Sequence, residues 1–310
     1  MNELELIHRL TRNLPANPAL VVGAGDDCAV LDVGLPDDQL LFKTDAVVEG
    51  VHFTSDAPAE KVGHKALARC LSDVAAMAGK PTAALITLAL PPKFDLTYVE
   101  GIYSGINTLA ERWHVAVAGG ETTTNPGQIL ISVALVGLVS KQRTLLRSGS
   151  KAGDALFVTG ELGGSLSGKH LEFEPRLAEA QWLAENFPVH AMIDISDGLA
   201  GDLRHLMHAG KTGAEILSRA IPISRAAKLQ AQAESSAKPP LLAALTDGED
   251  FELLFTLPGN QAVPLLDAWK KQFPKLKLTC IGKMSAEPGL KIRDKDGIRE
   301  LNVKGYTHFS

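Results

Sequence analysis

Carboxylates stand beside glycines or hydroxyl residues at six separated places in this chain, most of them where an apolar stretch ends. The acids at these places are Asp26, Asp27, Asp45, Asp73, Glu121, Asp194, Asp197, Glu249 and Asp250. A single acid in such a setting is more often a turn or a helix cap than a ligand. Six such places restrict the fold more strongly. If these carboxylates converge, their mutual repulsion destabilises the site unless hard cations bind there. The sequence therefore predicts a fold that gathers strand ends around magnesium ions and phosphate ligands.

The segment 116–124 shows this pattern most plainly. Its apolar start runs into Gly119 and Gly120, and Glu121 and three threonines follow. Glycines let the backbone approach a bulky group, and carboxylate and hydroxyl oxygens are hard donors. We expect a loop here at which a metal ion and a phosphate meet, although an ordinary turn has a similar composition.

Two other acidic places have structural alternatives. Asp26 and Asp27 stand between glycines and an apolar run, so they form either a solvated turn or a cation site. Asp73 falls in the predicted helix 60–78, where a pair with Arg69 one turn earlier is the ordinary explanation.

The segment 192–199 carries two acids three residues apart, where a predicted strand turns into a helix. Asp197 can serve as the N-cap of that helix, but a cap does not explain Asp194 in the apolar run before it. The spacing of the acids is not that of an EF-hand calcium loop. The N-cap therefore remains open for Asp197, and Asp194 is the acid that this explanation leaves unaccounted for.

Two further motifs are set aside. Residues 163–169 fit the pattern G-x-x-x-x-G-K, but His170 stands where a Walker-type loop has the Ser or Thr that holds magnesium, so we reject that class. His205 and His208 have no evident acidic or thiol partner, so we expect both at the surface.

The composition is that of a globular protein with one or two domains. The chain has 310 residues, enough for two domains of ordinary size or one large one, and 45% of its residues are hydrophobic and 22% charged, as in a protein with a real core. A net charge of −5 without a basic block argues against a nucleic-acid partner, and an acidic protein needs divalent metal to bind phosphorylated ligands. The small, polar break at 148–154 places the boundary. We predict an N-terminal domain of residues 1–148 and a C-terminal domain of residues 149–310.

The cysteines and the apolar segments indicate the compartment. Three widely separated cysteines form neither a disulfide framework nor a zinc pattern. The first residues lack the apolar core of a signal peptide, and no apolar run approaches membrane-spanning length. We expect a cytoplasmic protein with no membrane partner.

Seven segments together resemble the thiamine-monophosphate kinase family. They are residues 25–27, 44–53, 71–77, 119–122, 194–199, 248–253 and 305–309. Val-Glu-Gly-Val-His-Phe at 48–53 and Leu-Ser-Asp-Val-Ala-Ala-Met at 71–77 are fairly specific to this family. Asp-x-Ser-Asp-Gly-Leu at 194–199 is shared across a superfamily that includes aminoimidazole ribonucleotide synthetase. The resemblance implies a two-domain α/β fold of the aminoimidazole ribonucleotide synthetase type, and a homodimer whose N-terminal strands pair across the interface.

The resemblance also implies an activity, namely transfer of the γ-phosphate of ATP to thiamine monophosphate to give thiamine diphosphate. By motif position, several magnesium ions would be held by Asp27, Thr44, Asp45, Asp73, Glu121, Asp194 and Asp197. ATP would be contacted by Tyr103, Gly120, Glu121, Arg147 and Ser196. Thiamine monophosphate would be contacted by His52, Glu249 and Tyr306, and Tyr306 would offer an aromatic face to the cationic thiazolium.

No residue is expected to act as a general base. The acceptor is a phosphate oxygen, which is largely ionised near neutral pH because its second pKa is about 6. Catalysis then consists of holding two anions in line and screening their repulsion with bound metal.

Three positions depart from the family pattern. Glu121 stands where Asp is expected, which keeps the charge and adds a methylene group. Lys43 precedes Thr44 where a Ser or Thr is usual, and its ammonium either replaces one metal ion or points to solvent; we expect solvent. Cys70 stands where Asn is expected. We hypothesise that this protein binds fewer metal ions than its relatives.

Three other functions are compatible with the same residues. One is an ATP-dependent phosphotransferase that acts on another small substrate, and a second is a metal-dependent phosphohydrolase that uses the carboxylates to activate water. The third is a non-catalytic nucleotide-binding relative. Formation of ADP that depends on thiamine monophosphate distinguishes the kinase from the hydrolase.

Overall fold

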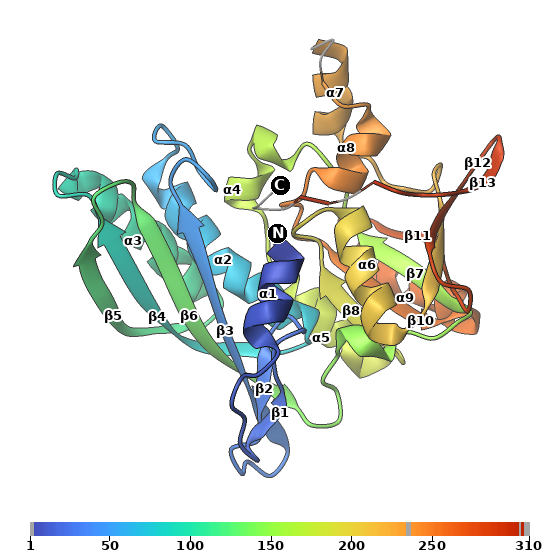
Figure 1. The fold of residues 1–310 in the computed structure, drawn as a ribbon, viewed down its shortest axis with the longest axis horizontal. Coiled ribbons are helices and arrows are strands. Elements are labelled where there is room, and N and C mark those ends of the chain that lie inside the picture. The colour runs from blue at the N-terminus through green and yellow to red at the C-terminus, as the bar shows by residue number, and fades with distance from the viewer. Residues whose placement is uncertain (1–2, 234–236, 304, 307–310) are drawn as a thin grey trace.

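The chain forms two mixed β-sheets that lie side by side with helices packed around them (Figure 1). In this computed structural model, residues 3–233, 237–303 and 305–306 are described. The two-domain α/β fold expected from the resemblance is confirmed in its two sheets. Among the described residues, no helix combines the length and the apolar character needed to cross a lipid bilayer.

The first sheet has six strands in the order β1-β2-β3-β6-β4-β5. The strands are β1 (Leu20–Val22), β2 (Ala29–Leu31), β3 (Asp38–Val48), β4 (Lys80–Leu90), β5 (Ala116–Thr124) and β6 (Leu130–Ser140). Neighbouring strands run antiparallel except β4 and β5, which are parallel. The helices of this half are α1 (Glu3–Thr11), α2 (Ala59–Ala76) and α3 (Leu96–Arg112).

The second sheet has seven strands in the order β13-β12-β9-β11-β7-β10-β8. The strands are β7 (Asp154–Thr159), β8 (Ala191–Asp194), β9 (Gly213–Leu217), β10 (Leu253–Pro258), β11 (Leu278–Ser285), β12 (Leu290–Asp294) and β13 (Gly297–Glu300). The helices are α4 (Lys169–Glu172), α5 (Leu177–Asn186), α6 (Leu199–Gly210), α7 (Arg225–Ala233), α8 (Pro240–Thr246) and α9 (Ala262–Gln272). Short 3₁₀ turns are η1 (Arg147–Gly149), η2 (Ser165–Ser167) and η3 (Gly259–Gln261).

Helix α2 joins the two halves. Fourteen of its eighteen residues are buried, far more than one face of an amphipathic helix supplies, because α2 packs on β3 and β6 of the first sheet and on α4, α5 and β8 of the second half. Its small residues permit this close packing. A side chain at Gly63 would collide with the backbone of α3, and one at Gly105 of α3 would collide with the backbone of α2. Because α2 is buried on several sides, the polar side chains Lys65, Ser72 and Asp73 lie in the interior.

The segment expected to form a loop at 119–124 is instead part of a strand. β5 continues to Thr124 and pairs with β4 beyond a bulge at Gly119, whose φ is +139°. At Gly120 a Cβ would collide with the carbonyl of Ile86 on β4, so the glycine serves the close approach of two strands. The loop prediction was wrong because small and hydroxyl residues tolerate an edge strand as well as a turn.

Candidate active site

Three carboxylates from distant parts of the chain converge in the interior, and we call them the carboxylate cluster. They belong to Asp27 before β2, Asp73 on α2 and Asp194 at the end of β8, and their oxygens lie within 4.8 Å of one another. All three residues are buried. Hard oxygen donors at this spacing fit a magnesium ion, which prefers a few carboxylates together with phosphate oxygens.

Each member of the carboxylate cluster has a partner in the chain. Arg147 donates to Asp27 through Nη2 at 2.6 Å and through Nε at 3.3 Å. Ser72 Oγ donates to Asp194 Oδ2 at 2.6 Å. The ammonium of Lys43 lies 3.0 Å from Asp73 Oδ2. The cluster is therefore held together by internal cations and hydroxyls as well as by any bound metal.

Lys43 points inward, and the expectation that it faces solvent was wrong. Side chains alternate along β3, so Lys43 and Asp45 share the face of the buried Leu41, which packs on α2, whereas Phe42 and Thr44 are exposed. Lys43 Nζ also lies 3.9 Å from Asp45 Oδ2. Thr44 is therefore placed on the opposite face from the carboxylates.

Burial and mutual repulsion shift the pKa values of these groups. Burial raises the pKa of Asp194 to about 7, and the charge of Asp27 adds to this shift. Burial likewise raises the pKa of Asp73 well above its ordinary range, against the opposing effect of Lys43. Burial tends to lower the pKa of Lys43, but the attraction of Asp73 and Asp45 is larger and raises it. The cluster therefore takes up protons readily, and metal binding must displace them.

The formal charges around the cluster leave room for added cations. The carboxylates that converge here or pair with its cations are Asp26, Asp27, Asp45, Asp73 and Asp194. The cations beside them are Lys43, Arg69 and Arg147. Five carboxylates against three cations leave two negative charges, which one divalent ion balances before any phosphate enters. Burial and the neighbouring charge of Asp27 raise the pKa of Asp26 to about 6.

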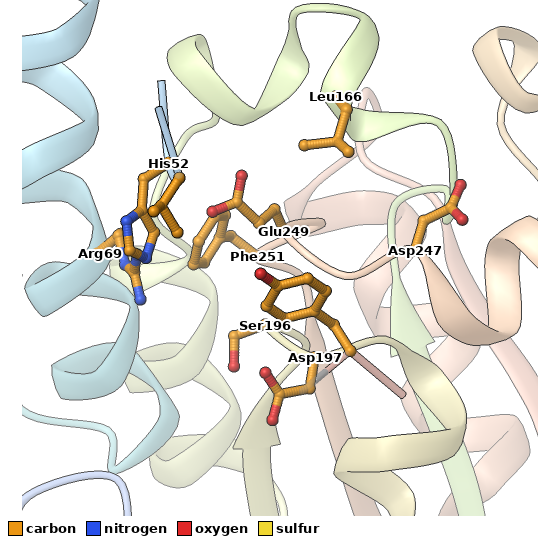
Figure 2. Close-up of a pocket in the computed structure, with 10 residues that line it drawn as sticks. His52, Arg69, Leu166, Ser196, Asp197, Asp247, Glu249 and Phe251 are labelled. Carbon is orange, nitrogen blue, oxygen red and sulfur yellow. The ribbon is translucent and has the colours of Figure 1, made fainter. Parts of the chain in front are cut away.

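A pocket opens beside the cluster, between α2 and the second half of the chain (Figure 2). Its lining residues are Val51, His52, Arg69, Leu166, Ser196, Asp197, Asp247, Glu249, Phe251 and Tyr306. All three residues expected to contact thiamine monophosphate line it, and so does Ser196. Ser196 and Asp197 follow Asp194 directly in the chain, so one strand end supplies both the cluster and the pocket wall.

The wall of the pocket is held by a buried lysine that the sequence did not single out. Lys65 Nζ donates to the carbonyl oxygen of His52 and to Glu249 Oε2, both at 2.6 Å. Burial lowers the pKa of Lys65 to about 8, although Glu249 opposes this shift. Glu249 itself has a φ of +54°, a conformation that a non-glycine residue adopts at a cost and that often marks a functional site. Lys65 thus ties the two sides of the pocket together.

Two of the acids before β10, Asp250 and Glu252, do not line the pocket and instead pair with groups in and after the glycine loop. Asp250 accepts hydrogen bonds from the backbone of Gly163 at 2.9 and 3.0 Å. Lys169, the lysine of the Walker-like pattern, lies 2.8 Å from the buried Glu252. Arg176 also donates to Glu252. Burial tends to raise the pKa of Glu252, but the charges of Lys169 and Arg176 together outweigh burial and lower it to about 2. Lys169 therefore neutralises a buried acid instead of facing a phosphate.

Some expected site residues lie away from the cluster in the single chain. Glu121 is exposed on β5, at the edge of the first sheet, and β4 and β6 separate it from β3. Three strand spacings put it about 14 Å from the residues opposite it on β3. Gly120 lies beside it, and Tyr103 is half-buried on α3 against the apolar core. The expected motif residues His308 and Phe309 fall outside the described part of the chain.

Two members of a second group of metal-compatible side chains, Asp202 and His205, were missed by the sequence reasoning. Asp197, Asp202 and His205 place ligand atoms within 4.8 Å of one another, and Asp202 Oδ2 accepts a hydrogen bond from the backbone of Asp197. His205 is half-buried, so the expectation of a surface residue without an acidic neighbour was wrong, whereas His208 is exposed as expected. The signal was the three-residue spacing of Asp202 and His205 on one face of α6.

Comparison with known proteins gives consistent results along the whole chain. Profiles of the family described as AIR synthase related protein match residues 25–139 with the N-terminal domain and residues 125–295 with the C-terminal domain. The thiamine-monophosphate kinase of Rhodopirellula baltica is 40% identical over 287 residues, which cover 90% of this chain and 87% of that protein. The thiamine-monophosphate kinase of Bacillus subtilis is 32% identical over the full length of both chains. A solved structure of AaThiL complexed with AMPPCP and TMP is similar with a TM-score of 0.82 and 32% identity, over 99% of this chain and 97% of that one.

Proposed function

Because this chain belongs to the thiamine-monophosphate kinase family, we propose that it transfers the γ-phosphate of ATP to thiamine monophosphate and so forms thiamine diphosphate. The observation that carries the proposal is one pocket that brings His52, Glu249 and Tyr306 together next to the carboxylate cluster. Binding of a nucleotide analogue and TMP by the similar AaThiL supports it.

The side chains divide the work of in-line phosphoryl transfer. Asp27, Asp73 and Asp194 would hold magnesium, and magnesium bound there screens the charge of the two phosphate groups. Arg147 neutralises Asp27 and orients it. Glu249, held by Lys65, and the aromatic ring of Tyr306 can face the cationic thiazolium. Positioning and charge screening thus account for the reaction.

His52 is arranged as a hydrogen-bond donor toward the pocket rather than as a base. Its Nδ1 accepts a hydrogen bond from the backbone of Val48 at 3.1 Å, so the neutral ring carries its proton on Nε2. We predict that His52→Gln keeps kcat within about 10-fold of the wild type and leaves the shape of the pH–rate profile unchanged, because general-base catalysis typically contributes more than this. Steady-state kinetics across the neutral pH range tests this. Loss of an acidic limb near neutrality in the variant would show that His52 acts as a base, because a general base works only when it is deprotonated.

Lys43 gives the hypothesis of a reduced metal complement a structural basis. Its ammonium lies between Asp45 and Asp73, where a cation is needed. We predict that Lys43→Thr lowers the melting temperature in magnesium-free buffer, because two acids lose their partner, and binds one more magnesium ion in complex with a non-hydrolysable ATP analogue. Equilibrium dialysis with metal analysis counts the ions. The control is Lys80→Thr, which removes an exposed strand lysine. An unchanged count in Lys43→Thr ends the hypothesis.

The homodimer is part of the proposal. β5 is an edge strand of nine residues, none of them buried, and such an edge is usually covered. Pairing of N-terminal strands between two copies would cover it and would also give Glu121 a route to the carboxylate cluster of the second subunit. We further propose a domain boundary at residues 148/149 and a cytoplasmic location. Light scattering on the purified protein tests the dimer, and a monomeric mass at micromolar concentration would refute it.

One assay separates the proposed kinase from its alternatives. Purified protein is incubated with ATP, Mg²⁺ and thiamine monophosphate, and both ADP and thiamine diphosphate are followed. The kinase forms them in equal amounts and only when thiamine monophosphate is present. A phosphohydrolase forms ADP without it, and a non-catalytic relative forms neither product.

A further inference from the structure

The guanidinium of Arg69 lacks the hydrogen bonds that a buried charge requires. The side chain is 15% exposed, and neither Nε nor Nη1 has a hydrogen-bond partner among the residues that the structure describes. Nη2 lies 3.7 Å from Asp45 Oδ1, which is attraction between charges and not a hydrogen bond. Buried hydrogen-bond donors without a partner cost free energy and are uncommon in folded proteins. We therefore expect a group that is not part of the described chain to accept hydrogen bonds from Arg69.

The open space that Arg69 borders is the pocket. The side chain enters the lining from α2, beside His52 (Figure 2). Among the lining residues that the structure describes, Arg69 is the one side chain that is always positively charged. The lining acids are Asp197, Asp247 and Glu249. An anion that enters the pocket is therefore repelled from the other walls and attracted to Arg69. The guanidinium can offer such an anion Nε and Nη1, two donors that have no hydrogen-bond partner among the described residues.

We infer that Arg69 binds the phosphate group of the acceptor substrate, an inference that rests on the proposed function and extends it. An arginine suits this role because its planar array of donors matches phosphate oxygens. The substrate carries opposite charges at its two ends, a phosphate and a thiazolium. Arg69 takes the phosphate end, and Glu249 and Asp247, which lie farther from α2 in Figure 2, face the cationic end.

This assignment also orients the substrate for the reaction. Asp73 of the carboxylate cluster follows Arg69 by four residues on α2, so the two side chains lie on the same side of the helix, about 6 Å apart along its axis. A phosphate held by Arg69 therefore faces the side of the pocket where the carboxylate cluster lies. Arg69 is in this sense a substrate-positioning residue, and it decides which end of the substrate meets ATP.

Calorimetric titration of Arg69→Gln, in the full chain with Mg²⁺, tests the inference. We expect the Kd for thiamine monophosphate to rise about 10- to 100-fold, as loss of hydrogen bonds to a charged group implies. The Kd values for ADP and for thiamine, which has no phosphate, should stay within about twofold of the wild type, because neither ligand places an anion on Arg69. Arg69→Lys keeps the charge without the planar array and should recover part of the affinity. Arg293→Gln, at an exposed arginine of β12, is the matched control and should leave all three Kd values unchanged.

Three outcomes would overturn the inference. The first is an unchanged Kd for thiamine monophosphate in Arg69→Gln while the wild type binds it, which leaves the kinase proposal intact. The second is an equal loss of affinity for thiamine and thiamine monophosphate, which shows that Arg69 only shapes the pocket. The third is a wild type that binds no thiamine monophosphate, which removes the proposed function itself. If Arg69→Gln fails to fold, the selective loss of thiamine monophosphate affinity in Arg69→Lys decides the question.

Discussion

Replacement of Asp194 by asparagine is expected to lower kcat by about 10²- to 10³-fold, the range seen when one preorganised electrostatic contact is removed. Asp194 is buried at the end of β8 within 4.8 Å of two other carboxylates, so its charge is present to hold a cation. Asparagine keeps the size of the side chain and can still accept the hydrogen bond from Ser72. The loss therefore reports on charge and not on packing.

The same substitution is expected to stabilise the protein when magnesium is absent. The pKa of Asp194 is about 7 in the folded chain, against about 3.9 for an unperturbed aspartate, so the folded state binds the proton more tightly. The stability contributed by the protonated acid is complete below about pH 3.9 and is lost as the pH rises to about 7. The asparagine of the variant is neutral at every pH and avoids this loss. Above neutral pH the gain is up to about 4 kcal/mol.

Urea unfolding with and without magnesium measures both effects. In chelator, Asp194→Asn should unfold at higher urea than the wild type, with a difference that grows between acidic and neutral pH. With Mg²⁺ the wild type should gain stability by mass action and the variant should gain less. Asp267→Asn, at an exposed aspartate of α9, controls for loss of a surface charge. A variant that keeps both its kcat and its stabilisation by magnesium would show that the cluster is not the metal site.

Replacement of Lys65 by methionine is expected to destabilise the folded chain by about 3–5 kcal/mol, as is usual when one partner of a buried ion pair is removed. Lys65 is fully buried, and its loss leaves Glu249 Oε2 and the carbonyl oxygen of His52 without this donor. Methionine fills most of the space of the lysine side chain. The loss of stability therefore measures the contribution of the ammonium charge and its hydrogen bonds. Affinity for thiamine monophosphate should fall as well, because both tethered residues line the pocket.

Lys61→Met is the matched control for this prediction. Lys61 lies on α2 one turn before Lys65 and pairs with Glu172, but its side chain is 45% exposed. Exposed pairs contribute about 0–1 kcal/mol, so the control should unfold close to the wild type. The free energy of unfolding from urea titration, measured under one condition for all three proteins, makes the comparison. Equal stabilities for the two variants would mean that water compensates for the loss of the Lys65 ammonium.

Much of the candidate site was predictable from local patterns. Asp194 interrupts an apolar run, and an N-cap at Asp197 does not explain it. Asp73 falls in the predicted helix, where a pair with Arg69 was the ordinary explanation. The structure brings these two together with Asp27, although they are up to 167 residues apart in the chain. The ordinary explanation for Asp73 fails, because Arg69 approaches Asp45 instead.

The predictions from sequence were wrong where a residue's environment depends on which other part of the chain packs against it. Lys43 was expected in solvent, since lysine usually is, but the alternation of β3 points it at α2. The segment around Glu121 has the composition of a loop, but pairing with β4 keeps it a strand. His205 was expected at the surface because its spacing from Asp202 on α6 was overlooked and because Asp197, the third member of the group, lies outside α6.

The sequence by itself determined the two-domain α/β class, the family, and the set of carboxylates from which a metal site can be built. The carboxylates stand in short motifs of residues close together in the chain, and the fold class and the family are what the resemblance carried by those motifs implies. The tertiary structure decided the pairings, because a salt bridge such as Lys65–Glu249 joins residues 184 positions apart. No local pattern encodes such a contact. Lys65 and Glu249 meet only because α2 packs between the two halves of the chain. That packing also placed Arg69 at the pocket and brought acids from three of the six acidic places together in one buried cluster.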